Sequence, residues 1–169
     1  MQAPLPIYIG ELNNTPLGDL RLAASDFGLV AVEWADSQLH FDAYLQRLKR
    51  PIEPNERKIA PYVKEIREYL EGTRHAFTIP IDWTLFRPFQ REALQAVFRI
   101  PYSEIRTYHD IAIQLGKPNA SRAIGRANAT NPMPLVIPCH RVIREDKTLA
   151  GYRWGMERKK KLLENESLQ

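Results

Sequence analysis

Cysteine is almost absent from this chain: Cys139 is the only one among 169 residues. A single cysteine excludes a disulfide within the chain and a zinc site built from several thiolates. The four histidines are scattered, and no two of them have the three- or four-residue spacing that places two imidazoles on one side of a helix. We therefore expect a protein of a reducing compartment that uses no metal and no cofactor.

Long apolar segments are also missing. No stretch approaches the ~20 apolar residues that cross a bilayer. Residues 1–14 include Pro4, Pro6 and Glu11, and they lack the basic start and apolar run of a signal peptide. The apolar fraction of 44% and the charged fraction of 26% are close to those of average globular proteins. We expect a soluble, cytoplasmic protein that folds around a core and does not bind membranes.

Charge is unevenly distributed along the chain, although the net charge is only +4. Residues 1–85 contain 9 basic and 12 acidic residues, a net charge of −3, whereas residues 86–169 contain 15 basic and 8 acidic residues, a net charge of +7. A polyanion such as nucleic acid is therefore expected to bind the second half.

The first 85 residues have the pattern of a small α/β domain. Apolar segments broken by turn residues predict three antiparallel strands, and apolar residues at helical spacing predict two helices. We expect strands at residues 5–12, 17–25, 28–35 and 76–83, a helix capped by Ser37 that ends near Lys49, and a helix at residues 60–70. The domain boundary is predicted near residue 85, which gives an N-terminal domain of residues 1–85 and a C-terminal domain of residues 86–169.

The second half is mainly helical in pattern. We expect helices at residues 89–98, 107–115, 119–128 and 156–166. The second and third of these are joined by Gly116, Lys117 and Pro118, as in a helix-turn-helix. A hairpin at residues 142–152 would form a wing beside it. The basic run at residues 158–161 of the last helix is most simply a solvated face.

The predicted helix at residues 119–128 is rich in small residues. Small side chains let helix backbones pack closely, but a slim helix that presents Arg122 and Arg126 can also enter a nucleic-acid groove. Composition alone favours neither interpretation.

Cys139 lies in an unusual local sequence. A lone cysteine is most often a buried packing residue, but here a thiol, an imidazole and a guanidinium follow one another at residues 139–141. Nearby cations favour a thiolate. Side chains of adjacent residues in an extended strand point to opposite faces, so Cys139 can meet His140 only if the backbone turns there.

The motif from Ile137 to Val142, Ile-Pro-Cys-His-Arg-Val, resembles the active-site sequence of the methylated-DNA–protein-cysteine methyltransferases, also called O6-alkylguanine-DNA alkyltransferases. The resemblance covers nearly the whole chain, and its motifs occur in the family's order. The other matching motifs are residues 15–18, 88–90, 100–102, 107–108, 121–125, 131–132 and 151–155.

This resemblance implies an α+β protein: a ribonuclease H-like N-terminal domain with a small antiparallel sheet, and a winged helix-turn-helix C-terminal domain that holds the active site. It implies direct, stoichiometric and irreversible transfer of an alkyl group from O6-alkylguanine, and from O4-alkylthymine, to Cys139. His140 would take the thiol proton through a water, and Glu166 would orient His140. Tyr108 would donate to the guanine ring, and Asn131 would brace the turn around Cys139.

The family match also implies the remaining site residues. The partner would be double-stranded DNA, from which the damaged nucleotide is flipped out, and Arg122 would fill the gap in the base stack. Ser121, Ala123, Gly125 and Tyr108 would complete the DNA-binding surface. The substrate pocket would be formed by Pro134, Val142, Tyr152, Arg153 and Trp154. We expect a monomer in solution, with cooperative binding along DNA left open.

Two other functions compete with repair. Alkyltransferase-like proteins bind the lesion without removing it, but they lack the acceptor cysteine that this chain has. A cysteine hydrolase that uses Cys139, His140 and Asn131 would leave the helix-turn-helix and the basic half unexplained.

Overall fold

The computed structural model describes residues 2–149 and 151–167. The chain divides into two compact units, Met1–Leu85 and Phe86–Gln169. Across the described ranges, no helix combines the length and the apolar character that crossing a membrane would require.

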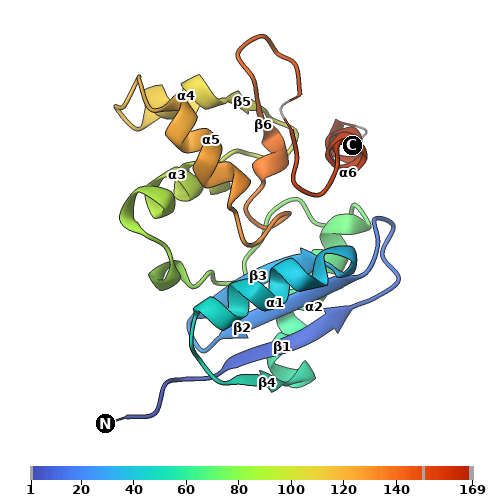
Figure 1. Ribbon diagram of the computed structural model, residues 1–169. Coiled ribbons are helices and arrows are strands. Elements are labelled where there is room, and N and C mark those ends of the chain that lie inside the picture. The colour runs from blue at the N-terminus through green and yellow to red at the C-terminus, as the bar shows by residue number, and fades with distance from the viewer. Residues whose placement is uncertain (1, 150, 168–169) are drawn as a thin grey trace. The chain divides into compact units, whose positions relative to one another are not determined.

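The first unit contains a four-stranded sheet with the strand order β3-β2-β1-β4 (Figure 1). Strands β1 (Ile7–Leu12), β2 (Leu20–Ser25) and β3 (Gly28–Trp34) form the expected antiparallel meander. The fourth strand, β4 (Ile52–Pro54), pairs in parallel with β1 and was not predicted. Its three residues are exposed at the sheet edge, where a proline is tolerated, so they have no apolar alternation that would indicate a strand.

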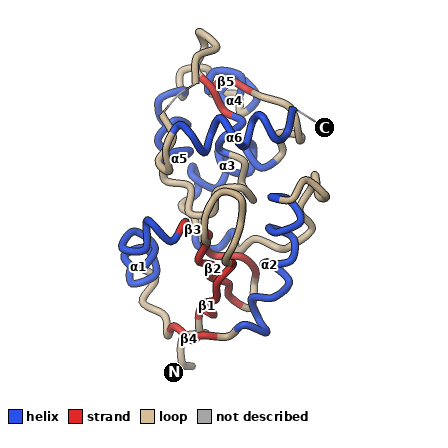
Figure 2. The backbone as a smooth tube through the Cα atoms, turned by 90° about the vertical axis from the view of Figure 1, so that its right-hand side faces the viewer, coloured by secondary structure: helices blue, strands red, loops and turns tan. Residues whose placement is uncertain are grey.

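Two helices cover opposite sides of this sheet (Figure 2). Helix α1 (Gln38–Arg47) follows a short 3₁₀ turn, and helix α2 (Glu56–Leu70) packs on β1 and β2. Ser37 occupies the predicted N-cap position of α1, but its side chain makes no capping hydrogen bond. Helix α2 begins four residues earlier than predicted because the side chain of Asn55 accepts a hydrogen bond from the Lys58 amide and so caps it there.

The strand predicted at residues 76–83 does not form. Only Ile81 makes a β-bridge, to Leu29, and the chain then enters a short 3₁₀ turn, Trp83–Leu85. The Asp82 carboxylate explains this ending: it accepts hydrogen bonds from the hydroxyls of Ser25 (2.5 Å) and Thr84 (2.5 Å), which a continuing strand would separate.

The described residues of the second unit form the α-helices α3 (Pro88–Phe98), α4 (Tyr108–Gln114), α5 (Ser121–Ala129) and α6 (Met156–Ser167). Helices α4 and α5 pack against each other and form the expected helix-turn-helix (Figure 1). Thr107 caps α4 through a reciprocal pair of hydrogen bonds with Asp110. The turn passes through Gly116, whose φ of +68° suits glycine.

The expected wing is only partly present. Its tip is a tight turn, closed by a hydrogen bond of 3.1 Å from the Arg144 amide to the Thr148 carbonyl. The strand before it, β6 (Val142–Ile143), pairs in parallel with β5 (Arg106–Thr107), and in the described part of the predicted hairpin, which leaves out residue 150, no returning strand pairs with it. Val142 and Ile143 are buried, so the pairing that covers them is with the segment that leads into α4.

Candidate active site

The backbone turns at Cys139 and is not extended there. The side chains of Cys139 and His140 are therefore not forced to opposite faces of the chain. Residues 139–141 form one turn of 3₁₀ helix, closed by a hydrogen bond of 2.9 Å from the Arg141 amide to the Pro138 carbonyl. The connector before it is fixed by the side chain of Asn131. Its Nδ2 donates to the Ile137 carbonyl (3.0 Å), and its Oδ1 accepts from the Met133 amide (3.0 Å). Asn131 therefore holds the two ends of this loop together beneath the cysteine.

The structure brings His140 and Glu166 together although 26 residues separate them in sequence. His140 Nε2 lies 2.9 Å from Glu166 Oε1, and both side chains are buried. Glu166 comes from the last turns of α6, which packs against the 3₁₀ turn. This contact fixes the orientation of the imidazole.

Arg141 also binds Glu166, a role that sequence reasoning missed. Its Nη2 lies 2.7 Å from Glu166 Oε1, and its Nε lies 3.0 Å from Oε2. Its Nη1 donates to the Ile100 carbonyl (2.7 Å). Its charge therefore neutralises the buried carboxylate, so Arg141 does not act as a free cation beside the thiol.

These contacts set the charge states of the carboxylate and the imidazole. Burial alone would raise the pKa of Glu166, but the hydrogen bonds from His140 and Arg141 outweigh it and lower that pKa to about 2. Burial lowers the pKa of His140, and the charges of Arg141 and Lys159 lower it further, against the opposing effect of Glu166. At neutral pH, an ionised Glu166 therefore orients a neutral imidazole that can accept a proton.

Lys159 corrects the prediction that the basic run at residues 158–161 is a solvated face. The Lys159 side chain is 1% exposed, and its Nζ donates to the Val142 carbonyl (2.8 Å). Burial lowers the pKa of its ammonium to about 8, and the charge of Cys139 in its ionised form is the main effect that raises it. Lys160 and Lys161 are exposed, so the run is divided between the two faces of α6.

The thiol of Cys139 is buried, with 1% of the residue exposed. Burial raises the pKa of this thiol, more than Asn131, Lys159 and Tyr152 lower it. Cys139 is therefore a protonated thiol at neutral pH, and a reaction at its sulfur would need a base.

Cys139 borders a cavity of about 40 Å³. Burial raises the pKa of the Tyr108 phenol on its wall, more than the amide of Asn128 lowers it, so Tyr108 keeps its proton and can donate it in a hydrogen bond. The other residues that line the cavity are Gly125, Asn128, Ala129, Gly151, Tyr152, Arg153 and Trp154.

The predicted pocket residues are only partly gathered at this cavity. The Arg153 guanidinium lies 4.2 Å from the ring centroid of Trp154, and the rings of Tyr152 and Trp154 meet edge to face at 4.9 Å. Pro134 and Val142 are buried, but neither lines the cavity. Asn128, which does line it, was not among the predicted site residues.

The two faces of helix α5 serve the two roles expected of it: one face packs in the core, and the other presents basic side chains. Ile124 and Ala127 are buried, whereas Arg122 and Arg126 are exposed one helical turn apart. Ser121, Ala123 and Gly125 are partly exposed. A Cβ at Gly125 would lie 3.9 Å from the Tyr108 ring, so this glycine leaves space beside the tyrosine. The helix both packs and presents basic side chains.

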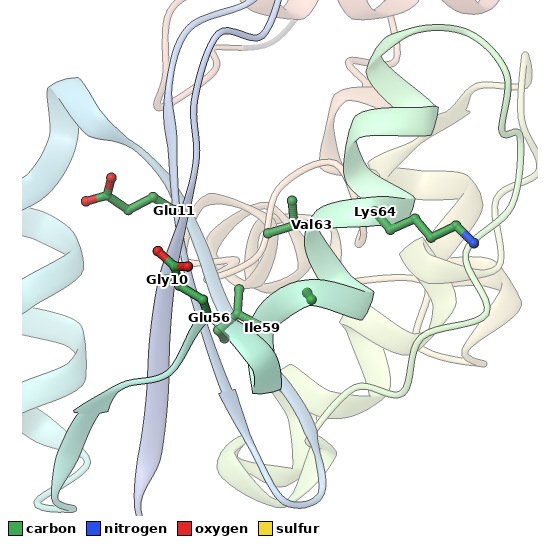
Figure 3. Close-up of a pocket in the computed structure, with 7 residues that line it drawn as sticks. Gly10, Glu11, Glu56, Ile59, Val63 and Lys64 are labelled. Atoms are coloured by element: carbon green, nitrogen blue, oxygen red, sulfur yellow. The ribbon is translucent and has the colours of Figure 1, made fainter.

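A second cavity, of about 360 Å³, lies between β1 and α2 in the first unit (Figure 3). Gly10 and Ile59 are in close contact there, and the Lys64 side chain extends away from them (Figure 3). Its lining includes no thiol, imidazole or hydroxyl group; the residues are Gly10, Glu11, Glu56, Ile59, Ala60, Val63 and Lys64. The buried cysteine is therefore the chemical centre that the structure offers.

Comparisons with known proteins agree with this assignment. Residues 8–83 match the ribonuclease-like domain of 6-O-methylguanine DNA methyltransferase, and residues 88–168 match the DNA-binding domain of the same family. The chain is 38% identical to the methylated-DNA–protein-cysteine methyltransferase of Salmonella typhimurium, over 90% of this chain and 91% of that protein.

Two further similarities cover different shares of the chain. The inducible methylated-DNA–protein-cysteine methyltransferase of Bacillus subtilis is 44% identical over 64% of this chain, which spans 60% of that protein. A crystal structure of Mycobacterium tuberculosis OGT in complex with DNA is similar with a TM-score of 0.77 and 31% identity, over 97% of this chain and 94% of that one. The chain thus belongs to the 6-O-methylguanine DNA methyltransferase family of DNA repair enzymes.

Proposed function

We propose that Cys139 is the alkyl acceptor and that it takes one alkyl group from O6-alkylguanine, or from O4-alkylthymine, in double-stranded DNA. The observation that supports this most directly is a buried cysteine followed in the same 3₁₀ turn by a neutral imidazole, His140, which an ionised Glu166 orients. This arrangement supplies a nucleophile, a base and the group that aligns the base.

The transfer is an in-line displacement at carbon. The thiol proton of Cys139 passes through a water to His140, and the sulfur forms a bond to the alkyl carbon while the bond from that carbon to O6 breaks. The electron pair of the broken bond stays on the guanine, to whose ring Tyr108 donates a hydrogen bond. In the net reaction the alkyl group replaces the proton on sulfur, and a proton replaces the alkyl group on guanine. The thioether is stable, so each molecule reacts once.

Two cations have different roles in this scheme. Lys159 is buried near Cys139, and its charge stabilises the thiolate as it forms. Arg141 is a positioning residue because it acts on Glu166, which in turn orients His140. By the family resemblance, the backbone amide of Arg153, which lines the cavity beside Cys139, would donate to O6.

DNA binding is assigned to residues 86–169, the unit with the net charge of +7. A stacked base cannot reach a buried thiol, so the nucleotide must leave the helix. In this proposal Arg122, which is exposed on α5, fills the gap, and Ser121, Ala123 and Gly125 contact the DNA backbone. The crystal structure of the Mycobacterium tuberculosis relative in complex with DNA supports DNA binding by this chain. We propose a cytoplasmic monomer that associates with the nucleoid when it is bound to DNA.

The decisive experiment measures the intact protein mass after incubation with an oligonucleotide duplex that contains O6-methylguanine. We expect the gain of one methyl group, located on Cys139 by peptide mapping, and no gain in Cys139→Ser. An unchanged mass with tight binding to the lesion would instead indicate a lesion-binding protein. Repeated turnover without a mass change would indicate a hydrolase.

A further inference from the structure

The segment that leads from α3 into β5 contacts both members of the Arg141–Glu166 ion pair. The Ile100 carbonyl accepts from Arg141 Nη1 (2.7 Å), and the ring centroid of Tyr102 lies 5.6 Å from the guanidinium carbon of Arg141. The hydroxyl of Ser103 donates to the main-chain carbonyl of Glu166 at 2.5 Å. Three residues of one short segment therefore bind this ion pair.

Glu166 lies in the last turn of α6, where a helix is least constrained. The last four carbonyls of a helix have no amide of the same helix as a donor, and helix ends fray. The Ser103 hydroxyl supplies a donor to the carbonyl of Glu166 itself, and the Tyr102 hydroxyl lies 3.5 Å from the neighbouring carbonyl of Asn165. The segment thus caps α6 at the residue whose side chain orients His140.

Ser103 makes this hydrogen bond from a backbone conformation that suits glycine. A tight turn is closed by a hydrogen bond of 3.1 Å from the Glu104 amide to the Pro101 carbonyl, and Ser103 is its third residue, with a φ of +66°. Glycine is the usual residue at this position of a turn, because a Cβ is strained in the left-handed region. Ser103 is exposed, so burial of its side chain does not offset the strain. A glycine here would relieve the strain but would lose the hydroxyl that binds Glu166.

We propose that Ser103 is a positioning residue for alkyl transfer: its hydroxyl fixes the last turn of α6 and so holds the Glu166 carboxylate against the imidazole of His140. The inference rests on the proposed function of Cys139. An ionised carboxylate can only accept, so the hydrogen between His140 and Glu166 lies on Nε2, which assigns the role of proton acceptor to Nδ1. A looser end of α6 would let the imidazole leave this orientation and would slow the transfer of the thiol proton.

Ser103→Ala and Ser103→Gly test the inference together, because both remove the hydroxyl and only glycine relieves the strain of the positive φ. We expect the urea midpoint of Ser103→Gly to lie above that of Ser103→Ala. Single-turnover methyl transfer from an O6-methylguanine duplex at saturating concentration should nevertheless slow about fivefold in both variants, the value of one hydrogen bond. The duplex concentration that gives half the maximal rate should not change, because the DNA-binding residues are intact.

Ser167→Ala is the matched control. Ser167 is the last residue of α6, and its hydroxyl donates within that helix, to the Glu164 carbonyl (3.0 Å). The variant removes a hydroxyl from the same helix end without touching the link to Ser103, so it should keep the rate of the unaltered protein.

A second measurement needs no DNA. In protein with isotope-labelled histidine, the hydrogen on Nε2 of His140 gives an NMR resonance, and its exchange with water reports how firmly Glu166 holds it. We expect this exchange to be about fivefold faster in both Ser103 variants and unchanged in Ser167→Ala.

Recovery of the unaltered rate and exchange in Ser103→Gly would overturn the inference, because the rate would then follow stability and not the hydroxyl. Failure of the unaltered protein to gain a methyl group would instead refute the proposed function. The exchange measurement would still decide whether Ser103 holds the pair of Glu166 and His140, so the two failures can be distinguished.

Discussion

Arg141 holds Glu166 by a forked ion pair in the interior of the second unit. Nη2 lies 2.7 Å from Oε1, Nε lies 3.0 Å from Oε2, and both residues are at most 5% exposed. The same carboxylate oxygen, Oε1, contacts His140. His140 is therefore oriented by Glu166, whose own position depends on Arg141. We expect the geometry of this ion pair to affect both the stability of the fold and the rate of the proposed reaction.

Arg141→Lys tests this dependence because it keeps the charge and removes the fork. A lysine ammonium cannot bind both oxygens of Glu166 and the Ile100 carbonyl in the same geometry. We expect the free energy of unfolding to fall by about 2 kcal/mol and the transfer rate to fall with it. Urea unfolding and single-turnover kinetics measure the two effects. Arg99→Lys, at an exposed position, should change neither, and equal stability of the two variants would contradict the prediction.

The lowered pKa of Glu166 predicts how stability depends on pH. Its pKa is about 2 in the folded protein against 4.5 as the reference, so its contribution is present above pH 4.5 and is lost as the pH falls toward 2. The contribution is on the order of 3 kcal/mol. The lowered pKa of His140 acts in the same direction below pH 6.5, because the unfolded chain then binds the extra proton.

Urea unfolding between pH 7 and pH 3 measures this dependence. Glu65 and Asp110 also have lowered pKa values and contribute to the acid sensitivity, so the comparison must be with a variant. Glu166→Gln removes only the ionisation of Glu166. We expect its stability to vary less with pH over this window than that of the unaltered protein, and parallel curves would exclude the role assigned to Glu166.

Lys159→Met tests whether the buried ammonium serves the reaction at the expense of stability. Burial lowers the Lys159 pKa from 10.5 to about 8, so the charged form costs stability below pH 8, and that cost is relieved as the pH rises toward 10.5. Methionine fills similar space without charge. We expect the variant to be at least as stable at pH 7 and to transfer the methyl group about tenfold more slowly.

The rate difference should also shrink above pH 8, where the ammonium of the unaltered protein loses its proton. Rates of Lys159→Met and the unaltered protein between pH 6.5 and pH 9.5 provide the check. Lys160→Met, an exposed neighbour, is the control and should have the unaltered rate throughout. A difference in rate that does not depend on pH would argue against an electrostatic role.

Sequence periodicity predicted the larger elements of this fold and failed on the smallest. Helices α3 to α6 and strands β1 to β3 have apolar residues at regular spacing, and they form within a few residues of their predicted bounds. Strand β4 has three exposed residues, and β5 and β6 have two each. Segments this short form through pairing with distant parts of the chain, which local patterns do not record.

Local patterns also failed to predict the long-range contacts of the site, and the exposure of Lys159 was predicted wrongly although its spacing indicates burial. Only the family resemblance connected Glu166 with His140, since no local pattern links residues 26 positions apart. The burial of Lys159 could have been predicted from spacing: Leu162 and Glu166 follow it by three and seven residues, on the same side of a helix. The run of basic residues concealed this pattern. Arg141 offered no such signal, because its contacts with Glu166 and Ile100 exist only in the folded chain.

Arg122→Ala tests the separation of base flipping from alkyl transfer. Arg122 is exposed on α5, whereas Cys139, His140 and Glu166 are buried, so its loss should leave the chemistry at Cys139 intact. A duplex must have its damaged base held outside the stack, whereas the free base O6-methylguanine needs no flipping. We expect repair of duplex DNA to slow by on the order of 100-fold, with the slower reaction of the free base unchanged.

Arg126→Ala is the control: it lies one turn further along the same face and removes an equal charge. It should cause a smaller loss that disappears at low salt, as for a phosphate contact. Mass spectrometry of Cys139 methylation measures all of these rates, and equal losses on duplex and free base would show that Arg122 supports the fold of the site instead of holding the flipped state.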